Sequence, residues 1–285
     1  MSASLRSSEN TSSLYVVATP LGNLGDITAR ALEVLRSVDF VAAEDTRHSR
    51  HLLDAFGIRT RLVALHEHNE QEAASQILRM LETGGSVALI SDAGTPGICD
   101  PGARAVARVR DAGFSVVPLP GPCAAVAALS VAGFAQAGFH FAGFLPARSG
   151  ARREAIAALR PLTVPWVVYE APHRIAASLA DLIAMLEPER EIVIARELTK
   201  RFEQIVRMPL GEALPWLAAD PDRSRGEFVL ILAAAPPREG LDPETLRVLD
   251  LLLAELPVKS AARLAAEITG APRNALYAAA LARKQ

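Results

Sequence analysis

The sequence contains little cysteine, and this limits the structures that it can form. Only Cys99 and Cys123 occur among 285 residues, too few for the disulfide framework typical of small secreted domains. Free thiols persist in a reducing compartment, so the cysteine content predicts a cytoplasmic protein. Cys99 lies in the most unusual loop of the chain, but no motif pairs a histidine with it. We therefore expect a buried, unreactive thiol rather than a nucleophile.

Long apolar runs and an excess of one charge are also absent. No stretch reaches the roughly 18 apolar residues that cross a bilayer, so we predict no membrane partner. The 30 basic and 32 acidic residues give a net charge of −2, so nucleic-acid binding would require a local basic patch. Residues 1–13 are Ser-rich without an apolar core, and we expect a disordered lead-in rather than a signal peptide.

Half of the residues are hydrophobic, and in the first half of the chain apolar strands alternate with helical stretches. This alternation, with short polar loops, predicts a parallel sheet with helices on both faces, forming an N-terminal α/β domain at 14–120. The predicted strands are 14–18, 39–43, 61–67, 87–90 and 116–119, and the predicted helices are 29–36, 46–56, 69–82, 103–112 and 124–131.

The second half has longer and more exposed strands, which favour a mixed sheet in a second α/β domain at 121–233. We expect its strands at 139–145, 166–169, 192–196 and 228–232, and its helices at 151–159 and 175–186. Residues 234–243 contain Pro236-Pro237 and Gly240 and are typical of a linker. Three short helices at 244–256, 260–269 and 273–283 follow, with the tight turn of a helix-turn-helix. An RNA-binding segment and a helical cap without a ligand explain this pattern equally well.

The loop SDAGTPGICDPG at 91–102 is the most informative stretch. It lacks the G-x-G-x-x-G pattern of a phosphate cradle and a following lysine, and Asp92 and Asp100 would repel a phosphate. The loop therefore favours a neutral or cationic ligand at the carboxyl end of a strand. We expect Asp100 to cap the next helix, Pro101 to be its first residue and Gly113 to end it.

Seven motifs occur in order along the chain: ATPLGNLGDIT at 18–28, AEDTR at 43–47, the loop at 91–102, PGP at 120–122, YEAPHR at 169–174, RELTK at 196–200 and GEF at 226–228. In this combination, the chain from Leu14 to Leu232 closely resembles the SAM-dependent tetrapyrrole methylase superfamily. Within it, the chain resembles the 16S rRNA (cytidine-2′-O)-methyltransferases, and its last segment resembles the C-terminal helix-turn-helix of that family. One departure is Ala171, where the family usually has serine.

The resemblance implies S-adenosyl-L-methionine (SAM) as the cofactor, held in a cleft between the two α/β domains. It implies 16S rRNA as the substrate and a homodimer as the assembly. Free rRNA and the assembled small subunit both stay open, and we favour the assembled subunit because a small protein without a strong net charge is poorly equipped to select one ribose from naked RNA. The SAM-binding residues that it implies lie in the loops of both domains: Pro20, Ser91, Asp92, Ala93, Gly94, Thr95, Pro96, Ile98, Pro120, Gly121, Pro122, Phe144, Ala171 and Gly226.

Methylation of a ribose 2′-hydroxyl needs a base that takes the hydroxyl proton. The candidates at strand ends are Glu44, Asp45, His66, Glu170, Glu197 and Lys200. A lysine could serve if burial or a cationic neighbour lowered its pKa, and Arg201 is such a neighbour of Lys200. The sequence does not choose among the candidates; we favour Asp45 and Lys200, with Glu197 as a third. Asp45 is equally explained as an acid at a helix N-terminus.

The predicted substrate contacts are Arg47, His66, Glu170, His173 and Arg174. The pair His66 and His68 could suggest a metal, but no third ligand is near in sequence, and we expect none. A basic rim for RNA would need Arg148, Arg152, Arg153, Arg174, Lys200 and Arg201 to converge; a scattered, solvated surface is the alternative.

Two other functions are open to this sequence. Other branches of the superfamily methylate corrin or porphyrin precursors, but such an enzyme has little use for an appended helix-turn-helix. The chain could also be a regulator that binds SAM and RNA or DNA without chemistry, and SAM binding without turnover on any RNA would distinguish that case.

Overall fold

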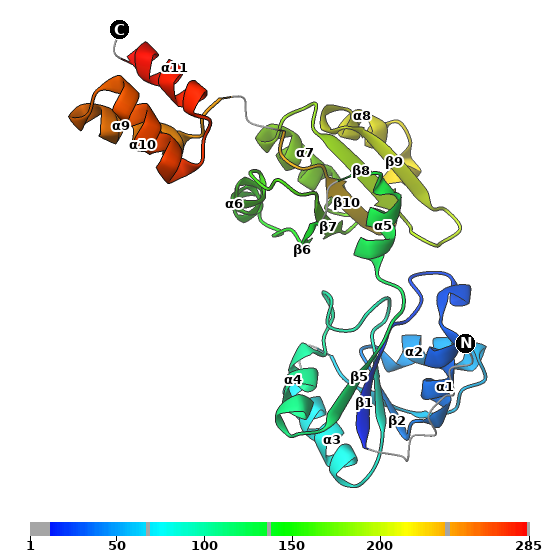
Figure 1. The fold of residues 1–285 in the computed structure, drawn as a ribbon. Coiled ribbons are helices and arrows are strands. Elements are labelled where there is room, and N and C mark those ends of the chain that lie inside the picture. Colours follow the sequence, from blue (N-terminus) through cyan, green and yellow to red (C-terminus); the bar gives the residue numbers. More distant parts are fainter. Residues whose placement is uncertain (1–11, 67–68, 136–137, 237–239, 284–285) are drawn as a thin grey trace, which may run out of the picture. The chain divides into compact units, whose positions relative to one another are not determined.

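The computed structural model describes residues 12–66, 69–135, 138–236 and 240–283. The chain divides into two compact units, with the boundary between Ala235 and Pro236. The first unit carries two five-stranded sheets, and the second carries three helices (Figure 1). Most of the predicted lead-in lies outside the described residues, but Ser13 already begins the first strand. No helix of the described chain is long and apolar enough to cross a membrane.

The first sheet is entirely parallel, as the alternation of strands and helices predicts. Its strands are β1 (Ser13–Val17), β2 (Phe40–Ala43), β3 (Arg61–Ala64), β4 (Val87–Ile90) and β5 (Ser115–Leu119), in the order β3-β2-β4-β1-β5. Their carboxyl ends lie at one edge of the sheet, which is where open parallel sheets place ligand-binding loops.

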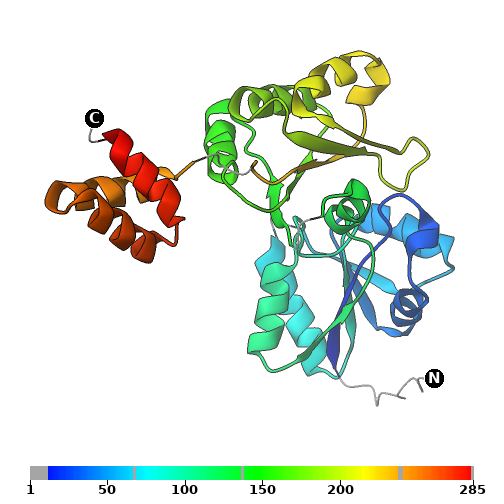
Figure 2. The same ribbon diagram turned by 45° about the horizontal axis from the view of Figure 1, so that its top comes forward.

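Helices cover both faces of this sheet because successive residues of each buried strand point to opposite sides. Helices α1 (Ala29–Ser37) and α2 (Thr46–Ala55) share one core with strand residues such as Val17 and Val41. Helices α3 (Glu70–Glu82) and α4 (Ala103–Asp111) lie side by side over the other face (Figure 2) and share a core with residues such as Leu14 and Leu89.

The second sheet is mixed, as predicted. Its strands are β6 (His140–Phe144), β7 (Trp166–Glu170), β8 (Glu191–Arg196), β9 (Gln204–Pro209) and β10 (Phe228–Leu232), in the order β6-β7-β10-β8-β9, and only β6 and β7 pair in parallel. Helix α5 (Ala124–Ala132) covers one face. The other face packs against α6 (Ser149–Leu159), α7 (Ile175–Met185) and α8 (Ala213–Ala218).

The sequence did not predict β9 and α8, for identifiable reasons. Strand β9 lies at the edge of the sheet, and its residues alternate between partly buried and exposed positions with Arg207 in the middle. Helix α8 has only six residues and contains Pro215, a strong helix breaker. Neither segment therefore carries the apolar periodicity on which such predictions depend.

The C-terminal unit consists of α9 (Pro243–Glu255), α10 (Val258–Thr269) and α11 (Arg273–Arg283), close to the three predicted helices. Asp242 caps α9 by accepting the Thr245 N–H. Gly270 ends α10 in the left-handed conformation that suits glycine. The core of the unit contains alanine and leucine side chains from all three helices.

The predicted start of α4 is wrong. Its N-cap is Gly102 rather than Asp100, and Pro101 precedes the helix. A carboxylate from α3 does the capping: Glu70 Oε1 accepts the N–H groups of Gly102 and Arg104, each at 3.0 Å. Gly113 ends the helix as predicted, with a φ of +84°. Because Glu70 satisfies the helix N-terminus, the side chain of Asp100 is available for another task.

Candidate active site

A pocket of about 430 Å³ lies between the loops at the ends of the two sheets. This volume is in the range of small-molecule sites, roughly 300–1,000 Å³. Its lining comes from both α/β domains and consists of Leu21, Glu44, Asp92, Ala93, Gly94, Thr95, Ile98, Cys99, Asp100, Cys123, Ala124, Phe144, Tyr169, Glu170, Ala171, Pro172, Ala195, Leu198, Glu227, Phe228 and Val229.

The charge of the lining is acidic. Carboxylates come from Glu44, Asp92 and Asp100 on the first sheet's side and from Glu170 and Glu227 on the second. The described residues that line the pocket include no lysine, arginine or histidine. Such a site repels phosphates and favours a ligand that carries positive charge, as the composition of the 91–102 loop predicts.

Three loops that are far apart in sequence meet beside this pocket. Thr19 and Gly94 exchange backbone hydrogen bonds of 2.8 and 3.0 Å, and the Thr19 hydroxyl donates to the Ser91 carbonyl. The Thr95 hydroxyl donates to the Pro122 carbonyl at 2.9 Å. The loops at 19–28, 91–102 and 120–122 therefore form one connected wall, which agrees with the sequence motifs.

The predicted SAM-binding residues divide into two sets. Asp92, Ala93, Gly94, Thr95, Ile98, Phe144 and Ala171 line the pocket, whereas Pro20, Ser91, Pro96, Pro120, Gly121, Pro122 and Gly226 lie outside its lining. Some of the second set hold the wall in place. A Cβ on Gly121 would lie 2.7 Å from the Cβ of Ala18, so glycine allows the close approach of the 120–122 loop to the residue that follows β1.

Asp100 is a pocket residue that the sequence analysis did not propose for chemistry. Burial, together with the nearby charge of Glu44, raises its pKa to about 6. A carboxylate with a pKa near neutrality is suited to take and release a proton. The sequence does contain this second aspartate in the 91–102 loop, but it was interpreted only as the cap of the next helix.

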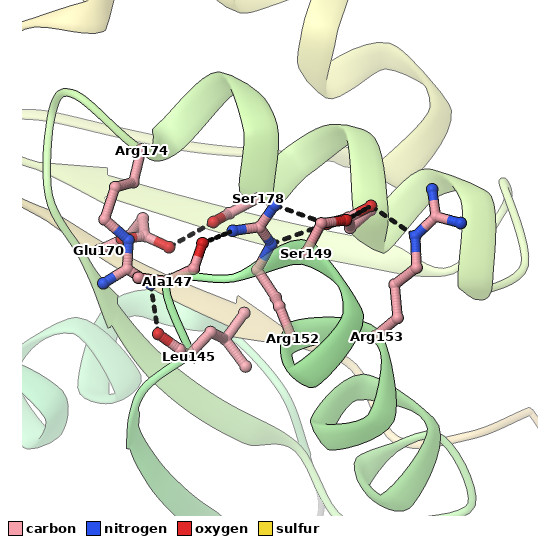
Figure 3. Close-up of polar contacts among 9 residues, drawn as sticks. Leu145, Ala147, Ser149, Arg152, Arg153, Glu170, Arg174 and Ser178 are labelled. Carbon is pink, nitrogen blue, oxygen red and sulfur yellow. Dashed lines mark hydrogen bonds and ion pairs between the residues drawn. The ribbon is translucent and has the colours of Figure 1, made fainter.

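Glu170, a predicted substrate residue, is buried and paired (Figure 3). Its Oε1 accepts the Ala171 N–H at 2.9 Å and lies 3.1 Å from Nε of Arg174, and its Oε2 accepts the Ser178 hydroxyl. Arg174 also donates to the Leu145 carbonyl. The pair thus ties the end of β6 to the end of β7, where Phe144 and Ala171 line the pocket.

A second buried ion pair supports the same segment (Figure 3). Arg152 donates to Asp181 Oδ2 through Nε at 2.8 Å and to the Ala147 carbonyl through Nη1 at 3.0 Å. Asp181 also accepts from Ser149 and from Arg153 at 2.7 Å. The hydrogen bonds from Arg153, Ser149 and Arg152 outweigh burial and hold the pKa of Asp181 below its ordinary value.

Of the two alternatives for the cations of the second domain, the contacts favour the scattered arrangement over a converging basic rim. Arg152 is 4% exposed, and Arg174 and Lys200 are engaged with Glu170, Glu197 and Glu227. Arg148, Arg153 and Arg201 are exposed, but Arg153 is paired with Asp181.

Asp45 lies just outside the lining of the pocket and caps α2. Its Oδ1 accepts the N–H groups of Arg47 at 2.8 Å and of His48 at 3.4 Å, and its own N–H donates to Asp92. Hydrogen bonds from the backbone and guanidinium of Arg47 lower the pKa of Asp45. The helix-terminus interpretation of this residue is therefore confirmed.

Glu197 and Lys200 form a network at the turn after β8. Lys200 Nζ lies 2.9 Å from both Glu197 Oε1 and Glu227 Oε2. Burial acts to lower the pKa of Lys200, but hydrogen bonds with the two carboxylates raise it above its ordinary value. The condition under which Lys200 could act as the base, a pKa lowered by burial or by Arg201, is therefore not met. Glu197 occupies the space beside Gly226, where a Cβ would lie 2.4 Å from its Cγ.

The remaining predicted substrate residues lie at the edges of the site. Arg47 and His173 are exposed near the starts of α2 and α7, and His66 follows β3 partly buried. Glu67 and His68 lie outside the described residues, so the proposed pairing of His66 with His68 is not seen. Across the described parts of the chain, no three His, Cys, Asp or Glu side chains are grouped to hold a metal.

Comparison with known proteins extends over nearly the whole chain. The family model "Tetrapyrrole (Corrin/Porphyrin) Methylases" matches residues 13–214, and "RsmI C-terminal HTH domain" matches residues 239–284. The chain is similar to "Ribosomal RNA small subunit methyltransferase I" of Escherichia coli O157:H7, with 53% identity over 94% of each chain. The protein of the same name from Pseudomonas aeruginosa is 53% identical over 95% of this chain and 97% of its own.

Among solved structures, the chain is similar to the uroporphyrin-III C-methyltransferase of Thermus thermophilus complexed with S-adenosylhomocysteine. The TM-score is 0.56, with 18% identity over 77% of this chain and 96% of the other. At this identity the similarity shows the shared fold of the two α/β domains.

Proposed function

We propose that this chain, which belongs to the tetrapyrrole (corrin/porphyrin) methylase family, transfers a methyl group from SAM to the 2′-hydroxyl of a cytidine ribose in 16S rRNA. The observation that carries this proposal is the 53% identity over nearly the full length of small-subunit rRNA methyltransferases, including the C-terminal domain. The choice of the ribose 2′-hydroxyl as the acceptor, and of cytidine as the nucleotide, rests on the resemblance of the sequence motifs.

The pocket suits SAM on three counts. Its volume accommodates a small cofactor, its carboxylates suit a cation, and Ala93 and Gly94 of the 91–102 loop belong to its lining. When bound, SAM supplies a methyl group on a positively charged sulfur. Phe144 and Ala171 line the second-domain side of the site. The predicted SAM-binding residues outside the lining, such as Pro20, Gly121 and Gly226, would hold the loops around it.

The chain must also withdraw the proton from the substrate hydroxyl as the new bond forms, and we assign this task to Asp100. It lines the pocket and has a pKa of about 6, so it is ionised at neutral pH and can accept a proton. Asp45, Glu197 and Lys200 stay predictions as bases. We favour Asp100 over them because Asp100 belongs to the pocket lining and none of the three does.

The protonation state of Lys200 also argues against this residue as the general base. A general base must be neutral or anionic before it accepts a proton, but the bonds to Glu197 and Glu227 favour the ammonium form. Lys200 instead contacts the loop of the other domain, because a Cβ on Gly22 would lie 2.2 Å from its Cγ. We assign Lys200 and Glu197 to positioning of the loops beside the site.

The setting of the reaction forms part of the proposal. The assembled small subunit is the expected substrate, in the cytoplasm, where both free cysteines remain reduced. A homodimer is supported by large apolar side chains exposed on the second domain, with Val126 54%, Val131 56% and Phe202 64% exposed. Sedimentation equilibrium of wild type and Val131→Glu tests the dimer, which the substitution should dissociate.

The reaction is tested by transfer of labelled methyl from SAM to small subunits purified from cells that lack the enzyme. Digestion to nucleosides should place the label in 2′-O-methylcytidine, identified by mass. Naked 16S rRNA, assayed in parallel, tests the requirement for an assembled subunit. Label in a tetrapyrrole precursor instead, or SAM binding without transfer to either RNA substrate, would refute the proposed reaction.

A further inference from the structure

A second concave site lies on the first domain, between α2 and β3. Its lining consists of Thr46, Arg47, Arg50, His51, Arg61 and Leu62, and we refer to it as the basic hollow. Within the described chain, no acidic residue belongs to this lining. Its charge is the reverse of that of the active-site pocket.

The fold places these cations together. Arg47, Arg50 and His51 occupy positions i, i+3 and i+4 of α2, so they share one helix face. Arg61 begins β3, the outer strand of the sheet, and its guanidinium lies 5.7 Å from the centre of the Phe40 ring. Arg50 donates to the Thr60 carbonyl at 3.2 Å, which joins α2 to the residue before β3.

The arginines remain accessible to a ligand. The Arg47 side chain is 90% exposed, and its contact with Asp45 is a single one at 3.4 Å. Arg61 is exposed. This differs from the second domain, where Arg152 and Arg174 are committed to internal carboxylates and carbonyls.

The basic hollow adjoins the active site. Glu44 lines the pocket, and Thr46 and Arg47 line the hollow. The four residues from Glu44 to Arg47 span at most about 11 Å of extended chain. An RNA strand with one ribose at the pocket would therefore have its neighbouring phosphates within reach of the hollow.

We infer that the basic hollow binds backbone phosphates of the substrate RNA next to the methylated nucleotide. This inference rests on the proposed function. Guanidinium groups bind phosphate through paired hydrogen bonds, and each neutralised phosphate releases counterions. Because the chain has a net charge of −2, a local cluster of this kind supplies the attraction that the whole molecule lacks.

The test compares Arg47→Ala/Arg61→Ala with Arg108→Ala/Arg110→Ala. The control removes the same charge from exposed positions of α4, on the opposite face of the first sheet. Binding to small subunits and to naked 16S rRNA is measured by filter retention over a range of salt concentrations, with S-adenosylhomocysteine present so that no turnover occurs. Methyl transfer is measured separately.

The hollow variant should bind both RNA substrates about tenfold or more weakly, and the salt slope of log K should fall by about two, one for each lost phosphate contact. In the transfer assay, KM for RNA should rise while kcat at saturation and the affinity for SAM stay at control values. Arg47→Lys/Arg61→Lys should keep most of the salt slope, because the charges remain.

A hollow variant whose salt slope equals that of the control would overturn the inference. Weaker binding to assembled subunits with unchanged binding to naked rRNA would also overturn it, and would assign the hollow to an acidic ribosomal protein. Because binding is measured without turnover, these results are separate from a failure of the proposed reaction, which wild-type enzyme alone would reveal.

Discussion

The two sheets both carry acidic residues at their carboxyl ends but use them differently. On the first sheet's side, Asp100 faces the pocket without a basic neighbour among the described lining residues, and its pKa rises to about 6. On the second, Glu170 and Glu197 are paired with Arg174 and Lys200. Charged residues at strand ends therefore belong to two functional types, which only their partners distinguish. In the proposed reaction, the first domain would supply the proton acceptor, and the paired residues of the second would hold the wall of the pocket.

The sharpest way to break this comparison is Asp100→Asn. We expect kcat to fall by about 10²–10⁴, because an amide cannot accept the hydroxyl proton. SAM affinity, measured by calorimetry, should fall much less than kcat, because Glu44 and Asp92 still line the same side of the pocket. Asp111→Asn, on the exposed end of α4, is the matched control. Activity within the range of that control would remove Asp100 from the chemistry.

The opposite outcome is expected of Asp181→Ala in the second domain. Loss of this buried carboxylate leaves Arg152 without its partner and should lower the free energy of unfolding by about 3–5 kcal/mol. Both tryptophans, Trp166 and Trp216, lie in this domain, so their fluorescence during urea unfolding reports on it directly. Arg152→Met/Asp181→Leu should recover much of the stability. Equal stability of Asp181→Ala and wild type would show that the pair does not support the wall.

The pH dependence distinguishes the two types of carboxylate further. Asp100 is active when ionised, so kcat should fall about tenfold per pH unit below pH 6 and level off above it. The free energy of unfolding should change with pH in the opposite direction to kcat. Because the pKa of Asp100 is raised in the folded state, the protonated carboxyl stabilises the fold at low pH, and this contribution is lost as the pH rises through 6. The residual activity of Asp100→Asn should not show this fall of kcat below pH 6. A fall that persists in this variant would belong to another group.

The smallest effect is expected at Asp45. Asp45→Asn keeps an oxygen that caps α2, and it should leave both the melting temperature and kcat close to wild type. Asp45→Ala should lower the melting temperature slightly, without a selective loss of kcat. A loss of kcat in Asp45→Asn comparable to that of Asp100→Asn would instead establish Asp45 as the base.

The sequence predicted the parts of this molecule that depend on local pattern. Strands β2 and β4 are apolar throughout, and Gly113 ends α4 because glycine accepts a positive φ. The motif loops correctly located the pocket at the ends of β2 and β4. These features need no knowledge of distant contacts.

The errors arose where distant residues decide the outcome. Glu70 caps α4 from 32 positions away, which released Asp100 from the expected capping role. Asp181 lies 29 positions from Arg152 and removes it from the surface. Periodicity and spacing carry no information on such pairs, so the accessible cations had to be found in the structure.

The position of β3 at the edge of its sheet has a consequence for association between molecules. Within the described chain, β3 pairs only with β2, so its other edge presents unpaired backbone groups on which a strand of another molecule could add. The strand has only four residues, and its first residue is Arg61. Arg59 lies two residues before it. Short length and positive charge are features that oppose such edge-to-edge aggregation. Arg61 therefore also protects the solubility of the fold, and alanine variants of the basic hollow should be handled at low protein concentration.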